Sequence, residues 1–161
     1  MKSLEETKGT FTDPRDSKVY KTVEIGEQTW LAENLNYEAE GSVCYENNPA
    51  NCAKYGRLYN WETAKTVCPK GWHLPSNAEW DKLFCFVDGD KGTNKYGFSS
   101  LPGGNGYSDG SFRNVGNGYW WSTTEFGASY DYLRYIYYYY SNGYRDGGLE
   151  SNLYSVRCLQ D

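Results

Sequence analysis

Residues 61–84 read WETAKTVCPKGWHLPSNAEWDKLF and contain two helix signals joined by an extended link. In the second half, Ser76 and Glu79 have the spacing of a capping box, in which each side chain satisfies a free backbone amide at a helix start. The apolar residues that follow recur at helical spacing, at Trp80, Leu83, Phe84 and Val87. The pattern predicts a helix that turns this apolar stripe toward the core.

A second helix is predicted just before it, over Leu58–Cys68, where Trp61, Ala64, Lys65 and Cys68 recur at helical spacing. Asn60 is a suitable N-cap, and Pro69 ends the helix because proline disfavours a helical residue before it. The link between the helices holds the only histidine, His73. We expect His73 to be a hydrogen-bonded structural residue rather than a catalytic one.

Upstream of the helices, the pattern predicts three strands joined by turns. Residues 13–16, Asp-Pro-Arg-Asp, are a turn signal, residues 18–25 alternate polar with apolar side chains, and Gly26-Glu27 predicts a hairpin. We expect Tyr37–Tyr55 to be a loop. Downstream of the second helix, the glycine-rich stretch 97–118 predicts a long loop region dominated by turns.

The C-terminal stretch, residues 119–161, holds ten of the 17 tyrosines. Aromatic and β-branched residues favour strands, and Ser-Asn-Gly or Asp-Gly-Gly favour turns. Strands are therefore expected near Tyr119–Thr123, Tyr130–Tyr140 and Leu153–Cys158, with turns at Ser141–Gly143 and Asp146–Gly148. Strand side chains alternate between faces, so the long middle strand would present tyrosines on both of its faces.

A small domain cannot bury both of those faces. Either one face is a solvated tyrosine ladder, or the exposed tyrosines form a recognition surface, because tyrosine offers a large, rigid contact area at low entropic cost. Trp120 and Trp121 are adjacent and would point to opposite faces of their strand. We expect one in the core and the other near solvent or the glycine-rich loop. Aromatic platforms stack on sugar rings, but two packing tryptophans that hold the long loop are the favoured interpretation.

Length and charge limit the function classes. The 161 residues suit one domain, which we place at residues 9–161 after a polar, disordered tail at residues 1–8. The formal net charge of −5 argues against a nucleic-acid partner, since phosphate binding needs a basic surface. No stretch reaches the 18 or more apolar residues of a membrane span. No signal segment stands at the start, which suits a mature chain from which one was removed.

Five cysteines occur, without a Cys-x-x-Cys pair. Cys44 and Cys52 lie eight positions apart across a turn-rich segment, which suits a local disulfide, and Cys68 and Cys158 could tie the middle of the chain to its end. Two disulfides would imply an oxidising compartment. The alternative is five buried free thiols in a cytosolic protein. Cys85 would be left over, and we expect an inert, buried thiol because its neighbours are apolar.

Catalytic and metal chemistry are weakly signalled. Asp88, Asp90 and Asn94 offer oxygen atoms suited to a structural calcium ion, but Gly92 stands where an EF-hand loop needs a ligand. The Glu-Pro-Asn and Trp-Asn-Asp motifs of calcium-dependent sugar-binding lectins do not occur. A single histidine without a Gly-x-Ser-x-Gly motif argues against a serine hydrolase. We therefore expect no catalytic residue, no resident metal and no cofactor.

Several segments in order carry a family resemblance, namely KVYKTVEIGEQTWLAENLNY, CAKYGRLYNWETA, VCPKGWHLPSNAEWDKLF, YGFSSLPGGN, WWSTTE and YSVRCLQD. They resemble the Fibrobacter succinogenes major paralogous domain, a bacterial family of surface or secreted proteins. The two-helix segment and the closing SVRCL resemble the C-type lectin-like fold. That resemblance implies an α+β fold with two helices on a twisted antiparallel sheet, and it pairs Cys68 with Cys158.

The resemblance and the tyrosine-rich stretch together predict a non-catalytic extracellular or cell-surface module that binds a protein or a carbohydrate. The expected binding residues are Trp121, Tyr130, Tyr132, Tyr135, Tyr137, Tyr138, Tyr139, Tyr140, Tyr144 and Arg145, with Trp121 and Arg145 near the rim. Two alternatives are a structural or adhesive surface protein that self-associates and an enzyme related to formylglycine-generating enzymes.

Overall fold

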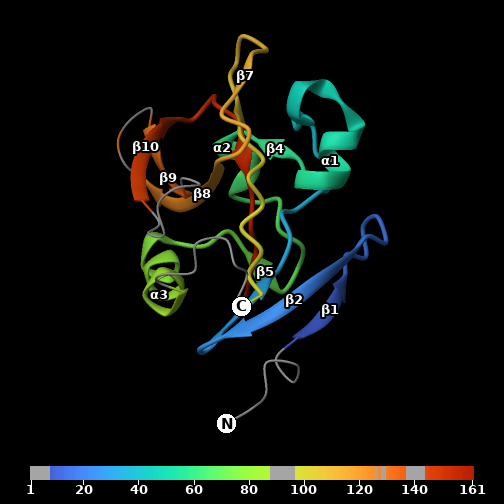
Figure 1. Cartoon of the computed structure of the whole chain (residues 1–161), viewed down its shortest axis with the longest axis vertical. Helices are drawn as coiled ribbons and strands as arrows, with labels where there is room; N and C mark the ends of the chain where they lie inside the picture. Colours follow the sequence, from blue (N-terminus) through green and yellow to red (C-terminus); the bar gives the residue numbers. More distant parts are fainter. Residues whose placement is uncertain (1–7, 88–96, 126, 128–129, 137–143) are drawn as a thin grey trace.

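The computed structural model describes residues 8–87, 97–125, 127, 130–136 and 144–161, and for residues 8, 87, 130–136 and 144–146 the description covers the backbone alone. In these residues the chain is α+β, with antiparallel sheets and three α-helices (Figure 1). The mixed class expected from the sequence is therefore confirmed.

The first sheet brings the two ends of the described chain together. Its strand order is β1-β2-β3-β12-β5, in which all neighbours are antiparallel. The three strands predicted at the start are confirmed, and the last strand inserts between two much earlier ones. The strands are β1 (Lys8–Thr12), β2 (Val19–Ile25), β3 (Gln28–Leu31), β5 (Trp72–His73) and β12 (Leu159–Gln160).

The second sheet has the order β10-β9-β8-β11-β4 and contains one parallel pair, β8 with β11. Its strands are β4 (Leu58–Tyr59), β8 (Gly118–Glu125), β9 (Tyr130–Ile136), β10 (Tyr144–Leu149) and β11 (Tyr154–Ser155). A short hairpin pairs β6 (Asn105–Gly106) with β7 (Phe112–Arg113) and projects from one end of the molecule (Figure 1).

The predicted capping box opens α3 (Asn77–Val87). The Ser76 amide donates to Glu79 Oε1 at 2.9 Å, and the Glu79 amide donates to Ser76 Oγ at 3.3 Å. Trp80 and Leu83 from the predicted apolar stripe have no exposed surface. Both the position of this helix and the face that it buries are therefore confirmed.

The helix predicted over Leu58–Cys68 is shorter in the structure. Leu58–Tyr59 forms strand β4, and α2 covers only Trp61–Ala64. The Asn60 cap is confirmed, because its Oδ1 accepts from the Thr63 amide at 2.9 Å. Thr66 and Val67 are weak helix formers, and pairing of β4 with β11 removes the first residues from the helix.

Three further expectations are corrected. The predicted loop at Tyr37–Tyr55 contains α1 (Pro49–Tyr55) and a short 3-10 helix at Tyr45–Asn47. The predicted turn at Asp146–Gly148 lies within β10, because ladder pairing with β9 holds these residues extended despite their turn preference. The strand expected over Leu153–Cys158 is confined to β11. The predicted turn at Ser141–Gly143 lies outside the described residues.

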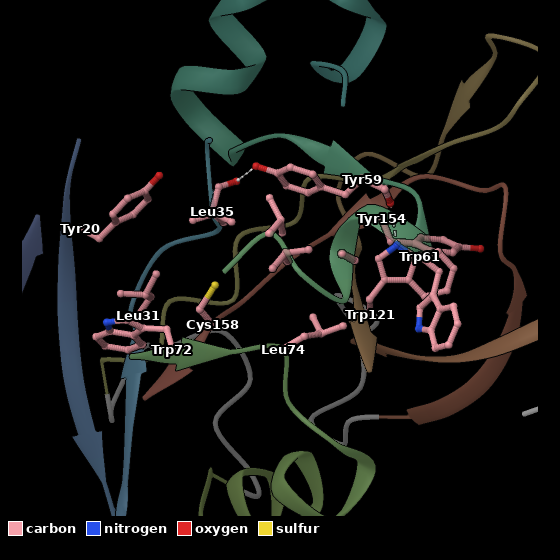
Figure 2. Packing of buried hydrophobic residues seen from close by; sticks show 13 residues of the cluster. Tyr20, Leu31, Leu35, Tyr59, Trp61, Trp72, Leu74, Trp121, Tyr154 and Cys158 are labelled. Atoms are coloured by element: carbon pink, nitrogen blue, oxygen red, sulfur yellow. Dashed lines mark hydrogen bonds between the residues drawn. The ribbon is translucent and has the colours of Figure 1, made fainter. Parts of the chain in front are cut away.

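Two apolar clusters fill the interior. The first draws residues from both sheets, including Tyr20, Leu31, Trp72, Trp121 and Tyr154 (Figure 2). The second gathers aromatic rings around α3, with Trp80 lying 4.9 Å from Trp30 and 6.1 Å from Trp120 between ring centroids. Each cluster takes one of the two adjacent tryptophans, so both sides of β8 are covered.

Both predicted disulfides are present. Cys44, which precedes α1, is bonded to Cys52 within that helix. Cys68 is bonded to Cys158 over a sequence separation of 90. Cys158 has no exposed surface and lies in the first apolar cluster. The long disulfide thus ties the segment after α2 to the end of the chain at the point where the first sheet closes.

Candidate binding surface

The register of β8, β9 and β10 places tyrosines side by side. Tyr119 of β8 pairs with Tyr135 of β9, which pairs with Tyr144 of β10. These three tyrosines, which we call the tyrosine row, cross all three strands. Tyr119 is half-buried, and its ring lies 5.9 Å from that of Tyr154 on the next strand, β11. The row therefore starts from a ring that is packed in place.

Two buried tryptophans anchor β8, one on each of its faces. Trp120 Nε1 donates to Asn34 Oδ1 at 2.8 Å, and Trp121 Nε1 donates to the Tyr59 carbonyl at 2.6 Å. The Trp121 ring meets that of Tyr154 edge-on at 4.6 Å (Figure 2). Both indole N–H groups are satisfied inside the protein, so each tryptophan is anchored by a hydrogen bond as well as by packing.

The rim position expected for Trp121 is corrected by this packing. Its side chain is 0% exposed, as is that of Trp120. The expectation treated β8 as a strand with one solvated face, whereas each face of β8 lies against its own apolar cluster. Trp121 therefore packs in the first apolar cluster, on the same face of β8 as Tyr119.

The other predicted binding residues lie on two strands or beyond them. Tyr130, Tyr132 and Tyr135 belong to β9, and Tyr144 and Arg145 to β10, which is an outer strand of the sheet in the described part of the chain. The remaining four, Tyr137, Tyr138, Tyr139 and Tyr140, lie outside the described residues. Tyr119 was not predicted as a site residue, because only the register between strands shows that it shares a row with Tyr135.

The β6–β7 hairpin belongs to the glycine-rich stretch and is bonded to the chain next to β11 of the second sheet. Gly106 and Leu153 exchange two backbone hydrogen bonds of 2.9 Å, and the Phe112 ring lies 5.3 Å from that of Tyr45. At the hairpin tip, Asp109 Oδ1 accepts from the amide and hydroxyl of Ser111, which lowers the pKa of Asp109. The predicted loop region is thus structured by its own contacts.

His73 is clamped between two carboxylates. Its Nδ1 lies 2.7 Å from Asp161 Oδ1, and its Nε2 lies 2.9 Å from Glu79 Oε2. Partial burial opposes the charged imidazole, but the hydrogen bonds and negative charges of Asp161 and Glu79 outweigh it, so the pKa of His73 is raised above its ordinary value of 6.5. The structural role expected for His73 agrees with this arrangement.

We expect the clamp to make stability depend on pH. A histidine whose folded pKa is raised contributes its full stabilisation below its unfolded pKa and loses it as pH rises through the folded pKa. The free energy of unfolding should therefore fall between about pH 6 and pH 9 in the native chain and fall less in His73→Gln. Urea denaturation at both pH values measures this, and an identical slope in the two proteins would contradict it.

Cys85 is exposed, which corrects the expectation of a buried thiol. It lies on the side of α3 opposite Leu83, so its apolar sequence neighbours do not cover it. Near it, a hollow of about 530 Å³ runs between α3 and the β2–β3 turn. Phe86, which is 52% exposed, lies against that turn, where an added Cβ on Gly26 would come within 3.1 Å of its ring.

Metal-binding groups are scarce in the described part of the chain. Within it, no group of three or more His, Cys, Asp and Glu side chains lies close enough to hold a metal ion. The calcium candidates Asp88, Asp90 and Asn94 lie outside the described residues. No helix in the described ranges is long and apolar enough to cross a membrane.

Comparison with known protein families gave a match to part of the chain. Residues 23–91 match the family model described as the Fibrobacter succinogenes major domain. The matched segment runs from β2 through α3, and so includes the capping box, α1, α2 and three of the four bonded cysteines. Neither the curated proteins nor the solved structures gave a match.

Proposed function

From the premise that this chain carries a Fibrobacter succinogenes major domain over residues 23–91, we propose that it is an extracytoplasmic, non-catalytic binding module. Its ligand, a protein or a carbohydrate, is bound on β8, β9 and β10. Both disulfides support the location, since such bonds persist in oxidising compartments. The observation that carries the binding role is the tyrosine row, Tyr119, Tyr135 and Tyr144, set in register across three strands.

The physical argument for this surface is preorganisation. When a binding surface is already ordered, the ligand loses no free energy in ordering its side chains and backbone. More of the favourable contact energy therefore appears as affinity. Strand β8 is fixed from both sides by Trp120 and Trp121, and its ladder with β9 extends this order outward. Tyrosine rings can stack on sugar rings or apolar side chains, while their hydroxyls hydrogen-bond.

We extend the proposal to the fold, which we take to be C-type lectin-like. Two features support it. The last strand, β12, returns to lie between β3 and β5, so the chain closes on its beginning. The Cys68–Cys158 disulfide ties the segment after α2 to the residue just before β12. The disulfide is the pairing that the resemblance to the C-type lectin-like fold implies.

A glycan and polysaccharide screen, run beside a protein pull-down, tests the binding role. We expect Tyr135→Ala/Tyr144→Ala to weaken binding by about tenfold or more, as loss of central aromatic contacts does, while the melting temperature stays near that of the native chain. The matched control is Tyr37→Ala, a half-buried tyrosine outside the second sheet that contacts Arg15. Unchanged affinity in the folded double variant would overturn the proposal.

One observation favours a second function, self-association. Among the described residues, strand β10 is an outer strand of its sheet, and an outer strand can pair with a second copy of the chain through backbone hydrogen bonds. Sedimentation across a range of concentrations would then show reversible oligomers. These should be lost when Asp146 is replaced by proline, which cannot donate a ladder hydrogen bond. Monomers at all concentrations would exclude this function.

A further inference from the structure

A separate hollow lies away from the tyrosine row, where the first sheet, α1 and the segment after α3 meet. Its volume is about 410 Å³, within the range of small-molecule sites. Lys21 and Thr22 come from β2, Glu33 follows β3, Lys54 comes from α1, and Ser99 and Leu101 come from the later loop. We call this hollow the lysine cavity.

A buried cation stands behind one wall of the lysine cavity. Arg157 has no exposed surface, and its Nη2 donates to the carbonyl of Ser99, a lining residue, at 2.7 Å. Its other hydrogen bonds go to Asn34 Oδ1 and to the carbonyls of Leu31 and Phe98. All of these acceptors are neutral, so no carboxylate among the described residues forms an ion pair with Arg157.

The charges around the cavity do not cancel. Lys21, Lys54 and Arg157 are cations, and Glu33 is the one lining carboxylate. Glu33 Oε2 already accepts from the Lys21 amide at 2.7 Å. The burial of Arg157 lowers its pKa to about 9, which still leaves it charged at neutral pH. A chain with a formal net charge of −5 thus concentrates positive charge at one concave site, which attracts anions.

The uncharged lining residues and Glu33 indicate which kind of anion fits the lysine cavity. Thr22 and Ser99 carry hydroxyls, and Glu33 offers carboxylate oxygens, which accept hydrogen bonds from ligand hydroxyls. Ala32 and Leu101 give apolar surface, against which the C–H face of a ring can pack. A ligand that matches all three features has a carboxylate, several hydroxyls and an apolar ring face.

We propose that the lysine cavity binds an acidic sugar of monosaccharide size, a hexuronate, with its carboxylate held by Lys21 and Lys54 and its hydroxyls directed to Glu33. Charge-assisted hydrogen bonds of this kind are about twice as strong as neutral ones. The site is independent of the tyrosine row, and the proposal stands whether or not that row binds a ligand.

Calorimetric titration of the whole chain with D-galacturonate tests the proposal, with D-galactose as the neutral analogue and acetate as an anion without hydroxyls. We expect galacturonate to bind, galactose and acetate to bind at least tenfold more weakly, and the affinity to fall as sodium chloride is raised. No binding at millimolar galacturonate would overturn the site. If acetate bound as tightly as galacturonate, the cavity would be an unspecific anion site and the hexuronate proposal would fail. If galactose bound as tightly as galacturonate, the positive charges would have no part in binding and the proposal would fail as well.

Variants locate the binding. Lys21→Gln and Lys54→Gln change exposed side chains, so each should keep its melting temperature while weakening galacturonate binding about tenfold, the effect of one charge-assisted hydrogen bond. The matched control, Lys70→Gln, changes an exposed lysine that does not line the cavity and should bind normally. Full affinity in Lys21→Gln/Lys54→Gln would overturn the proposal. Tyr135→Ala/Tyr144→Ala should retain galacturonate binding, which separates this site from the proposed tyrosine surface.

Discussion

Removing the long disulfide, with Cys68→Ala/Cys158→Ala, is expected to lower the free energy of unfolding by about 4–5 kcal/mol. The reason lies mainly in the unfolded chain. A bond across a sequence separation of 90 removes many unfolded conformations, and their entropy returns when the bond is lost. Because domains are stable by only about 5–15 kcal/mol, this variant should be close to unfolding at ordinary temperatures. Urea denaturation of both proteins measures the loss.

The short disulfide provides a matched comparison within the same chain. Cys44 and Cys52 are separated by 8 positions, so the same chain-entropy argument gives a loss of only about 2–3 kcal/mol for Cys44→Ala/Cys52→Ala. Both variants remove two sulfurs and add no free thiol. Equal losses in the two variants would contradict an effect governed by loop length and would point to the native contacts of the bonds instead.

Asn34→Ala is expected to cost about 3–5 kcal/mol, because it leaves several buried donors without acceptors. Asn34 Oδ1 accepts from Trp120 Nε1 at 2.8 Å and from Arg157 Nη2 at 2.8 Å and Nε at 3.2 Å. Its Nδ2 donates to the Tyr55 carbonyl at 2.8 Å. Asn34 itself is 2% exposed, so water cannot easily replace the lost groups.

The matched control for Asn34 lies two residues away. Asn36 is half-buried, and its hydrogen bonds to Tyr20 and Lys18 use its backbone amide and carbonyl. Asn36→Ala keeps both groups and should change the free energy of unfolding by about 0.5 kcal/mol or less. Chemical denaturation of the two variants gives the comparison. A similar small loss in Asn34→Ala would show that the buried network around Arg157 contributes little to stability.

Several local features were correctly predicted because each depends on residues close together in the sequence. The Ser76–Glu79 capping box and the Asn60 cap need only three or four positions. The Asp13–Asp16 turn closes through a hydrogen bond from the Arg15 amide to Asp13 Oδ1. Helix α1 was missed although its signals are equally local, with Asn48 as cap and Pro49 following it. That error came from treating the segment bridged by Cys44–Cys52 as a loop throughout.

The tyrosine row could not be derived from the sequence. The composition of residues 119–161 indicated tyrosine-rich strands, but the row of Tyr119, Tyr135 and Tyr144 depends on the register of three strands. Register is the alignment of residues between two paired strands. The alternation of side chains within one strand does not specify which residues of the neighbouring strand they pair with. The same pairing explains why Asp146–Gly148 is extended although its composition favours a turn.

The sequence by itself determined the α+β class, the start of α3, the Asn60 cap of α2, the three N-terminal strands and a pairing of cysteines that the structure contains, because these depend on short spacings and on a recognisable order of motifs. Only the tertiary structure decided which side chains are covered. It buries Trp120 and Trp121 on opposite sides of β8, exposes Cys85, and joins Asn34 to Arg157 across 123 positions. Burial and long-range hydrogen bonds depend on packing between distant segments, which no local pattern records.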